Sequence, residues 1–289
     1  MIMKNTTKEK RSIAVLAVGI AVALLFGCFG NLTGVFMSAD NIAHAEEPKI
    51  ELIAKFSTYY GDSKQNRKDN IALACRKIDG TVLNPEDEFS FNGAVGRRTE
   101  ANGFKTAYII RDGEFVEGTG GGVCQVSTTI YNCALLANLA ITCVYPHSLP
   151  VAYVAPSFDA MVSSVSDLRF VNTLSTPLTI KMRADEKCAY AEIYGVREAD
   201  IRRRSEVIST IPYPTQYQEV SSIPVGEEKI DTYGKNGIKS VGYLDFFKNG
   251  QVVKSVKIRN DTYMPQKQII FKGVKQQENN VDNGDILNN

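Results

Sequence analysis

The sequence contains no tryptophan and only two histidines, His44 and His147, among its 289 residues. Neither sign of charge dominates, because 33 Lys and Arg residues balance 32 Asp and Glu residues and leave a formal net charge of +1. Nucleic-acid-binding proteins usually carry a strongly basic surface and a recognisable motif, and this sequence has neither. We therefore expect no nucleic-acid partner, and chemistry that needs an imidazole has two candidates at most.

Cysteine is also sparse, and the six cysteines form no C-x-x-C pair. Structural zinc sites usually use such pairs, so we expect no metal site. Cys28 lies in the N-terminal apolar segment, and the five cysteines that remain are an odd number. At least one thiol is therefore unpaired or pairs between chains. The five are Cys75, Cys124, Cys133, Cys143 and Cys188.

The first 45 residues have the features of an export signal. Basic residues before position 12 precede an apolar run over 13–37, and Ala43-His44-Ala45 supplies an A-x-A cleavage site. The apolar run is long for a signal, so the segment is either cleaved after Ala45 or retained as a single membrane anchor. In both cases we expect the body of the chain outside the cytoplasm. Cleavage would leave His147 as the single histidine of the mature chain.

The rest of the chain divides into two regions and a tail. Residues 46–198 mix helical and strand patterns, which indicates an α+β domain whose mixed sheet surrounds a central helix with Cys124 at its N-terminus. Residues 199–275 combine short alternating strands with regular glycines and predict a small all-β domain. Residues 276–289 are polar and aperiodic, and we expect them to be disordered.

Within the first region, local patterns predict individual elements. Apolar residues at helical spacing predict helices over 70–78, with Asn70 as N-cap, and over 123–141. Asp112-Gly113 between two β-rich arms predicts a hairpin over 106–117. Residues 151–195 read as a series of strands.

The stretch EGTGGGVCQVSTTIYNCALLANLAI, residues 117–141, sets three glycines before one thiol. At a helix N-terminus, Cys124 would feel the positive end of the helix dipole, which favours the nucleophilic thiolate. Gly120, Gly121 and Gly122 could admit a substrate and expose N–H groups to an oxyanion. Gln125 and Ser127 are further candidates for binding the oxyanion or the substrate. The alternatives are that Cys124 is a small core residue and that Ser127 satisfies a local backbone group.

His147 is the candidate base for this thiol. It lies between Pro146 and Pro150, a few residues after the predicted helix, on a constrained non-helical segment. A lone cysteine with a distant histidine is a typical nucleophile and base. Asp159 is the nearest downstream carboxylate and a candidate for orienting the imidazole, although it could equally be a solvated loop residue. Arg98 is a candidate for binding a substrate carboxylate with both guanidinium nitrogens.

Three segments carry a resemblance to a known family. EFSFNGAVGRRTEANGFKTA, GEFVEGTGGGVCQVSTTIYNCALLANLAI and YPHSLPVAYV with the later FDAMV closely resemble the VanW family of exported Gram-positive proteins. The resemblance covers about residues 50–196. Two positions depart from the family pattern: Ser157-Phe158, where the family usually has Gly-Arg, and Arg97, where it usually has Pro. Residues 202–274 resemble a G-five module, an all-β domain associated with cell-wall proteins.

The resemblance implies a cell-wall activity without metal or organic cofactor. Members resemble L,D-transpeptidases that use a cysteine of the VanW domain to form 3–3 crosslinks. Cys124 would then attack a peptidoglycan stem peptide, and His147 would act as base and acid. The implied partners are stem peptides, wall glycans through the C-terminal module, and the cytoplasmic membrane if the N-terminal segment is retained.

Two other functions remain open from the sequence. The chain could be a non-catalytic wall-binding or envelope-assembly protein in which Cys124 belongs to the core. It could also be a cysteine peptidase or carboxypeptidase of wall peptides, with water as the acceptor.

Overall fold

The computed structural model of the protein describes residues 49–111 and 113–275. The expected export segment, the expected disordered tail and Asp112 of the predicted hairpin turn lie outside these residues. Strands predominate and helices are few in the described part, where no helix is long and apolar enough to cross a membrane. Both regions described below belong to the compact unit that follows Glu46.

The principal sheet of the first region has four strands in the order β1-β9-β8-β2, and every neighbouring pair is antiparallel. The prediction of a mixed sheet in this region was therefore wrong. The central strand β9 alternates half-buried and buried residues, because one of its faces packs against the helices. The strands are β1 (Glu51–Tyr59), β2 (Val82–Leu83), β8 (Leu178–Ala184) and β9 (Cys188–Gly195).

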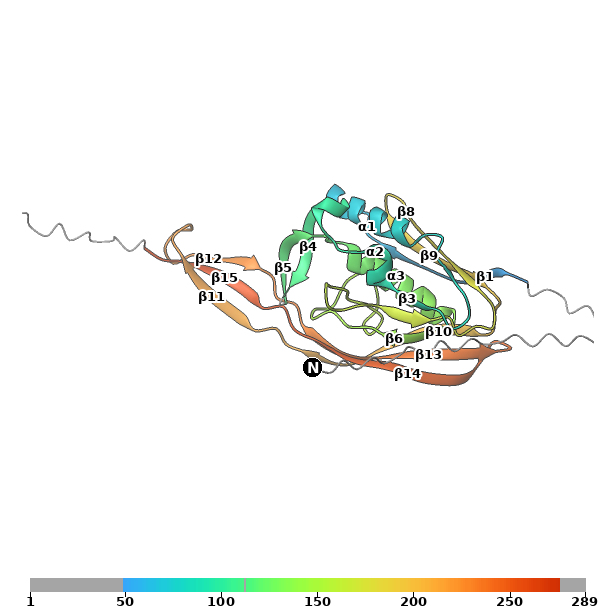
Figure 1. The fold of residues 1–289 in the computed structure, drawn as a ribbon. Helices are drawn as coiled ribbons and strands as arrows, with labels where there is room; N and C mark the ends of the chain where they lie inside the picture. Colours follow the sequence, from blue (N-terminus) through green and yellow to red (C-terminus); the bar gives the residue numbers. More distant parts are fainter. Residues whose placement is uncertain (1–48, 112, 276–289) are drawn as a thin grey trace, which may run out of the picture. The chain divides into compact units, whose positions relative to one another are not determined.

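Two helices, α1 (Gln65–Ile78) and α3 (Val123–Leu136), cover one face of this sheet (Figure 1). Helix α1 packs against β8, and α3 packs against β1 and β9. The α1 helix begins earlier than predicted, so Asn70 is a fully buried residue of its interior instead of an N-cap. Its amide donates to the backbone oxygens of Lys105 and Gly121 at 2.8 and 3.0 Å, which removes the cost of burying it.

Helix α3 is shorter than the 123–141 segment predicted from periodicity. It ends at Leu136 because Asn138 adopts φ 61°, a left-handed conformation that commonly terminates helices. The residues that follow form the strand β6 (Ala140–Cys143), which pairs with β7 (Arg169–Val171). Residues 151–168, where strands were expected, form loops and turns without a strand.

The remaining elements of the first region are short. The predicted hairpin is present as β4 (Thr106–Arg111) and β5 (Glu114–Thr119). A small antiparallel sheet has the order β3-β7-β6. The other short elements are β3 (Glu88–Ser90), α2 (Phe91–Val95) and the 3-10 helix η2 (Glu100–Asn102).

The C-terminal region contains strands without helices in its described residues, as predicted. One sheet has the order β10-β13-β14 and is antiparallel, whereas the second, β11-β15-β12, combines a parallel and an antiparallel pair. Ile201 and Leu244 of the first sheet join the hydrophobic core of the preceding region. The strands are β10 (Asp200–Ile211), β11 (Thr215–Val220), β12 (Glu228–Thr232), β13 (Gly237–Lys248), β14 (Gln251–Tyr263) and β15 (Gln268–Gly273).

Candidate functional site

Cys124 is the second residue of α3 and lies in the first turn of that helix. The N–H groups of a first helical turn have no carbonyl partner within the helix, and the helix dipole adds a partial positive charge there. The thiol is half-buried, so it remains within reach of a small reagent. These conditions favour a thiolate over a thiol.

The glycines before Cys124 form a closely packed turn. A Cβ on Gly121 would lie 2.5 Å from the carbonyl oxygen of Tyr108 and 2.8 Å from the carbonyl carbon of Ala107, and neither backbone atom can move cheaply. Gly120 and Gly122 have φ values of 90° and 105°, which L-residues with side chains rarely adopt. The glycines therefore allow hairpin β4–β5 and helix α1 to approach the start of α3.

His147 follows β6 and is buried, with 5% of its surface exposed. Its backbone N–H donates to Oδ2 of Asp159 at 2.6 Å, and its ring Nδ1 lies 2.6 Å from the same oxygen. Because Nδ1 faces the carboxylate, Nε2 is the ring nitrogen left for the hydrogen bond between His147 and Cys124. The three candidate residues Cys124, His147 and Asp159 therefore meet in one chain of contacts.

The protonation of the Cys124 and His147 pair favours a thiolate with an imidazolium. Burial raises the pKa of the Cys124 thiol, but the hydrogen bond and charge of His147, the Val162 N–H and the charge of Arg98 bring it below its ordinary value. Burial lowers the pKa of His147, but hydrogen bonds to Asp159 and Cys124 and their negative charges raise it to about 9. An ion pair of this kind is typical of an activated nucleophilic cysteine.

Asp159 stays ionised although only 1% of its surface is exposed to solvent. Burial raises the pKa of its carboxyl group, but the hydrogen bond and charge of His147, the charge of Arg259 and the hydroxyl of Tyr263 bring it below its usual value. Arg259 and Tyr263 belong to β14 in the C-terminal region. They contact the carboxylate from the side opposite His147, through Oδ1.

Polar side chains of α3 hold the segment that carries Asp159. Ser127 donates its hydroxyl to the carbonyl oxygen of Ala160 at 2.6 Å, and Thr128 accepts the Ala160 N–H at 2.9 Å. Asn132 donates to the carbonyl oxygen of Phe158 at 2.8 Å. Ser127 was a candidate for contacting substrate or oxyanion, and the structure places its hydroxyl in these internal hydrogen bonds, with none of its surface exposed.

The same segment approaches Cys124 through Val162. The Val162 N–H lies 3.5 Å from the Cys124 sulfur, and the Val162 carbonyl oxygen lies 3.3 Å from it. At the other end of the segment, Ser157 has φ 65°, in the left-handed region that favours glycine. The family to which the sequence bears a resemblance usually has glycine at this position, and the local backbone gives the physical reason.

Gln125, another candidate for the oxyanion or the substrate, is 1% exposed and is also bonded internally. Its amide donates to the carbonyl oxygen of Tyr59 at 2.9 Å and accepts from Arg67 at 2.9 Å. Arg98, by contrast, lies beside the site, since the charge of Cys124 acts on the pKa of its guanidinium. Its guanidinium nitrogens donate to Asn92 Oδ1 and to the carbonyl oxygens of Gly96 and Ser163.

Four residues of the site were missed by sequence reasoning: Arg67, Tyr153, Arg259 and Tyr263. Arg67 lies on α1, and the charge of Cys124 acts on the pKa of its guanidinium, as it also does for Arg98. Arg259 and Tyr263 are about 100 residues from Asp159. No local spacing in the sequence signals these contacts, because they arise from the packing of separate elements.

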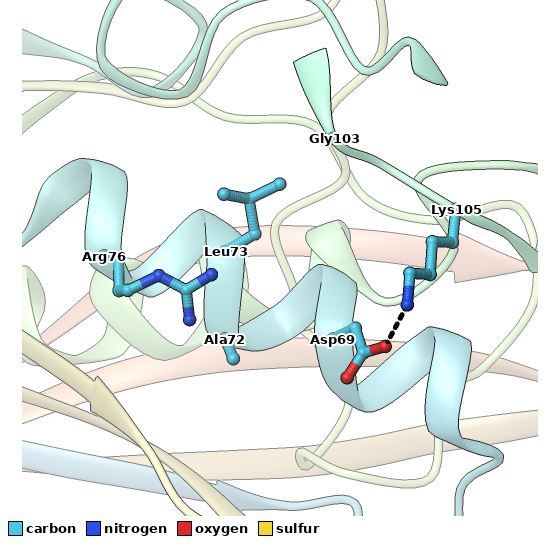
Figure 2. Close-up of a pocket in the computed structure, with 6 residues that line it drawn as sticks. All are labelled: Asp69, Ala72, Leu73, Arg76, Gly103 and Lys105. Atoms are coloured by element: carbon cyan, nitrogen blue, oxygen red, sulfur yellow. Dashed lines mark hydrogen bonds and ion pairs between the residues drawn. The ribbon is translucent and has the colours of Figure 1, made fainter. Parts of the chain in front are cut away.

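A surface pocket on α1 lies apart from this chain of contacts (Figure 2). An ion pair between Lys105 and Asp69, with a nitrogen–oxygen distance of 2.6 Å, crosses it. Neither Cys124, His147 nor Asp159 lines this pocket, so it is not part of the candidate site. Its lining residues are Asp69, Ala72, Leu73, Arg76, Gly103 and Lys105.

The other cysteines of the described residues are free thiols in different surroundings. Burial raises the pKa of Cys75 to about 12 and raises that of Cys133 further. Cys133 lies along α3 and contacts the Ala191 carbonyl oxygen at 3.4 Å, as a core residue would. Cys124 is therefore distinguished from Cys75 and Cys133 by its charged neighbours.

Comparison with known proteins identifies both regions. Residues 66–194 match the family described as VanW like protein, and residues 202–275 match the G5 domain. The chain is 42% identical over 179 residues to the uncharacterized protein YoaR of Bacillus subtilis (strain 168), covering 61% of this chain and 58% of that protein. It is 27% identical over 78 residues to the vancomycin B-type resistance protein VanW of Enterococcus faecalis (strain ATCC 700802 / V583), covering 27% of this chain and 28% of that protein.

The chain thus spans somewhat more than half the length of YoaR and about a quarter of VanW. Two of the similar solved structures are of G5 domains, and each covers about a quarter of this chain. The crystal structure of HP0197-G5 has 24% identity, covers 26% of this chain and 99% of that chain, and gives a TM-score of 0.17. The IgA1 protease G5 domain structure has 25% identity, covers 28% and 96%, and gives a TM-score of 0.20. From the family matches and these relatives, the chain contains a VanW-like region, residues 66–194, followed by a G5 domain, residues 202–275.

Proposed function

We propose that this protein is an extracytoplasmic cysteine acyltransferase of cell-wall peptides, similar to an L,D-transpeptidase. The observation that carries the proposal is the contact chain Cys124–His147–Asp159, with a thiol pKa below and an imidazole pKa above their ordinary values. An imidazole held between a thiol and a carboxylate is the arrangement by which a cysteine nucleophile is activated. Perturbed titratable groups of this kind concentrate at catalytic sites.

In the proposed reaction, the Cys124 thiolate attacks the carbonyl carbon between the third and fourth residues of a stem tetrapeptide. A C–S bond forms, the C–N bond breaks, and the His147 imidazolium gives its proton to the departing amine. An amine from a neighbouring stem then attacks the thioester, His147 takes its proton, and the thiolate leaves. Asp159 keeps the imidazole oriented through both steps.

Backbone N–H groups at the start of α3 are the proposed oxyanion donors. The Cys124 N–H belongs to the first helical turn, where the N–H groups lack carbonyl partners within the helix. Gly121 and Gly122 make no hydrogen bond through their N–H groups to the described part of the chain. Such donors are fixed before the reaction and act strongly in a half-buried site.

The second candidate is a hydrolase that uses the same thioester with water as acceptor. Cys124 is half-buried, so water can reach the thioester that forms on it and act as the acceptor. The relative from Enterococcus faecalis is named for vancomycin resistance, and we propose the cell wall as the location of this protein. The G5 domain is proposed to bind wall glycans.

Product analysis with purified protein and disaccharide-tetrapeptide tests the proposal. Mass spectrometry should detect crosslinked dimers together with released D-alanine, and Cys124→Ala should abolish both. Tripeptide monomers without dimers would favour the hydrolase. A folded Cys124→Ala protein with full activity would overturn the assignment of Cys124, and Cys143→Ala serves as the matched control for loss of a half-buried thiol.

A further inference from the structure

Arg67 carries a buried cationic group with an unused donor. One guanidinium nitrogen, Nη1, is buried and has no hydrogen-bond partner among the residues that the structure describes, while Nη2 donates to Oε1 of Gln125 at 2.9 Å. Within the described residues Arg67 forms no ion pair. A buried donor without an acceptor is costly, so a ligand that supplies the missing acceptor would be bound favourably at this nitrogen.

Two arginines flank the glycine turn that precedes Cys124. A Cβ on Gly122 would lie 3.0 Å from Cγ of Arg67, and a Cβ on Gly120 would lie 2.8 Å from Cβ of Arg98. Glycine at these positions lets both arginine stems pack against the turn. Among the described residues, neither guanidinium is paired with a carboxylate. The negative charge of Cys124 acts to raise the pKa of both, against the effect of burial.

We propose that Arg67 binds a carboxylate of the acyl donor close to the scissile carbonyl, and that the nearby charge of Arg98 assists this binding. A guanidinium matches a carboxylate with two parallel hydrogen bonds, which an ammonium cannot do. This proposal rests on the proposed function and specifies its substrate. A carboxylate bound beside Cys124 confines cleavage to the last peptide bond of the donor, so that the departing residue is the one with the free carboxyl terminus.

Alkylation of Cys124 tests the arginines without requiring any wall activity. Rates with iodoacetate, an anion, and iodoacetamide, its neutral analogue, are measured at Cys124 by peptide mass mapping. Both reagents react with the thiolate, so the ratio of the two rates does not depend on the fraction of Cys124 that is ionised. We expect Arg67→Gln to lower the iodoacetate-to-iodoacetamide ratio by about 3- to 10-fold, as expected for one nearby charge. Arg76→Gln, on the exposed face of the same helix, should leave the ratio unchanged.

A folded Arg67→Gln protein with an unchanged ratio would overturn the carboxylate site. If that variant fails to fold, acetate provides a test on the unmodified protein: acetate should slow iodoacetamide labelling of Cys124 compared with chloride at equal ionic strength, and equal rates would overturn the proposal. Tetrapeptides with a free or an amidated carboxyl terminus then test the substrate. Failure of both peptides to react refutes the proposed function, while the alkylation ratio still decides the role of Arg67.

A second observation concerns the C-terminal region and Asp159. The Tyr263 hydroxyl donates to Oδ1 of Asp159 and accepts the Ser157 N–H at 2.7 Å. Arg259 donates to the backbone oxygen of Asp159 and lies 3.4 Å from Oδ1. Tyr263 is 1% exposed, so this contact is excluded from water.

Further contacts fix the two regions at this point. The Met264 N–H donates to the carbonyl oxygen of Ser148, the neighbour of His147, at 2.7 Å. Ser240 of β13 shares a hydrogen bond of 2.8 Å with Ser157. Gly242, also on β13, lies so close that a Cβ would be 3.1 Å from Ser157. Strands β13 and β14 therefore pack against the segment that carries Asp159.

We infer that the G5 domain is part of the catalytic apparatus, with Tyr263 and Arg259 as positioning residues that fix the Asp159 carboxylate against His147. Without the Tyr263 donor, the carboxylate can rotate away from Nδ1 of His147. The titratable groups beside His147 and Asp159 are Cys124 of α3, Tyr153 of the loop that follows His147, and Arg259 and Tyr263 of β14. Arg259 also pairs with Asp261. A domain that acted only as a spacer would leave the titration of His147 unaffected by its own substitutions.

The imidazole titration of His147 by NMR tests this inference. The full chain contains two histidines, so His44→Gln assigns the two signals. Tyr263→Phe should shift the midpoint of His147 from about 9 toward the ordinary imidazole value, and Cys124 alkylation at pH 6 should slow in parallel. Tyr217→Phe, an exposed tyrosine of the same domain, should change neither.

A folded Tyr263→Phe protein with an unshifted His147 titration would overturn the inference. If the phenylalanine variant does not fold, Arg259→Lys replaces it, because lysine keeps the charge and loses the second nitrogen. A shift of His147 in that variant supports a positioning role, and an unchanged titration contradicts it.

Discussion

Ser127 and Ala160 are joined by a hydrogen bond of 2.6 Å from a helix hydroxyl to a loop carbonyl oxygen. Ala160 follows Asp159 directly and precedes Val162 by two residues. Together with Thr128 and Asn132, this hydroxyl connects the helix of the candidate nucleophile to the segment of the candidate orienting carboxylate. The segment depends on these hydrogen bonds because residues 151–168 contain no strand.

Replacing Ser127 with alanine should loosen that segment. The Ala160 carbonyl oxygen loses a buried donor, so the free energy of unfolding should fall by about 1–3 kcal/mol. Iodoacetamide labelling of Cys124 at pH 6 should also slow, since His147 is held less firmly. Urea unfolding and labelling kinetics measure the two effects. Ser164→Ala, at an exposed position of the same loop, is the control, and equal stability of both variants would contradict the expectation.

The cysteines should differ sharply in reactivity toward iodoacetamide under native conditions. At pH 6, Cys124 should be labelled well before Cys75 and Cys133, because its pKa is lowered while burial raises those of the other two. Mass mapping after short exposures measures the order. His147→Gln should remove the advantage of Cys124, and labelling of Cys124 in that variant at the wild-type rate would show that His147 does not activate it.

Acyl transfer should have a bell-shaped pH dependence. The rate rises as Cys124 deprotonates, at a pH below the ordinary range of a cysteine, because its pKa is lowered. It falls as the pH passes about 9, where His147 loses the proton needed by the departing amine. Steady-state rates from pH 5 to 10 locate both limbs. A rate that keeps rising above pH 10 would exclude an imidazolium as the general acid.

Two glycines with positive φ allow the cost of backbone strain to be separated from the cost of steric contact. Gly122→Ala adds a Cβ at φ 105° within 3.1 Å of Arg67, whereas Gly80→Ala adds one at φ 82° with no atom within 4 Å. Positive φ alone costs about 1–2 kcal/mol, so Gly80→Ala should lose about that much stability and Gly122→Ala more. Thermal unfolding measures both, and equal losses would show that close packing at Gly122 is unimportant.

Much of the local structure could be predicted from the sequence. The Asp-Gly hairpin, the helix that begins near Cys124 and the all-β C-terminal region each depend on short-range patterns. The predicted length of α3 was wrong because a single residue overrode a longer pattern. Asn138 ended α3 early although apolar periodicity continued to Ile141, because a left-handed residue stops a helix regardless of the pattern beyond it.

The sequence by itself determined which thiol and which imidazole were candidates, since histidine is scarce and one cysteine follows a glycine run. Only the tertiary structure decided what surrounds them. Arg67 reaches the site because α1 packs beside the glycine turn, and Tyr263 reaches Asp159 because β14 lies against its segment. Such contacts depend on how side chains of separate elements pack, and sequence periodicity reports only which face of each element is buried.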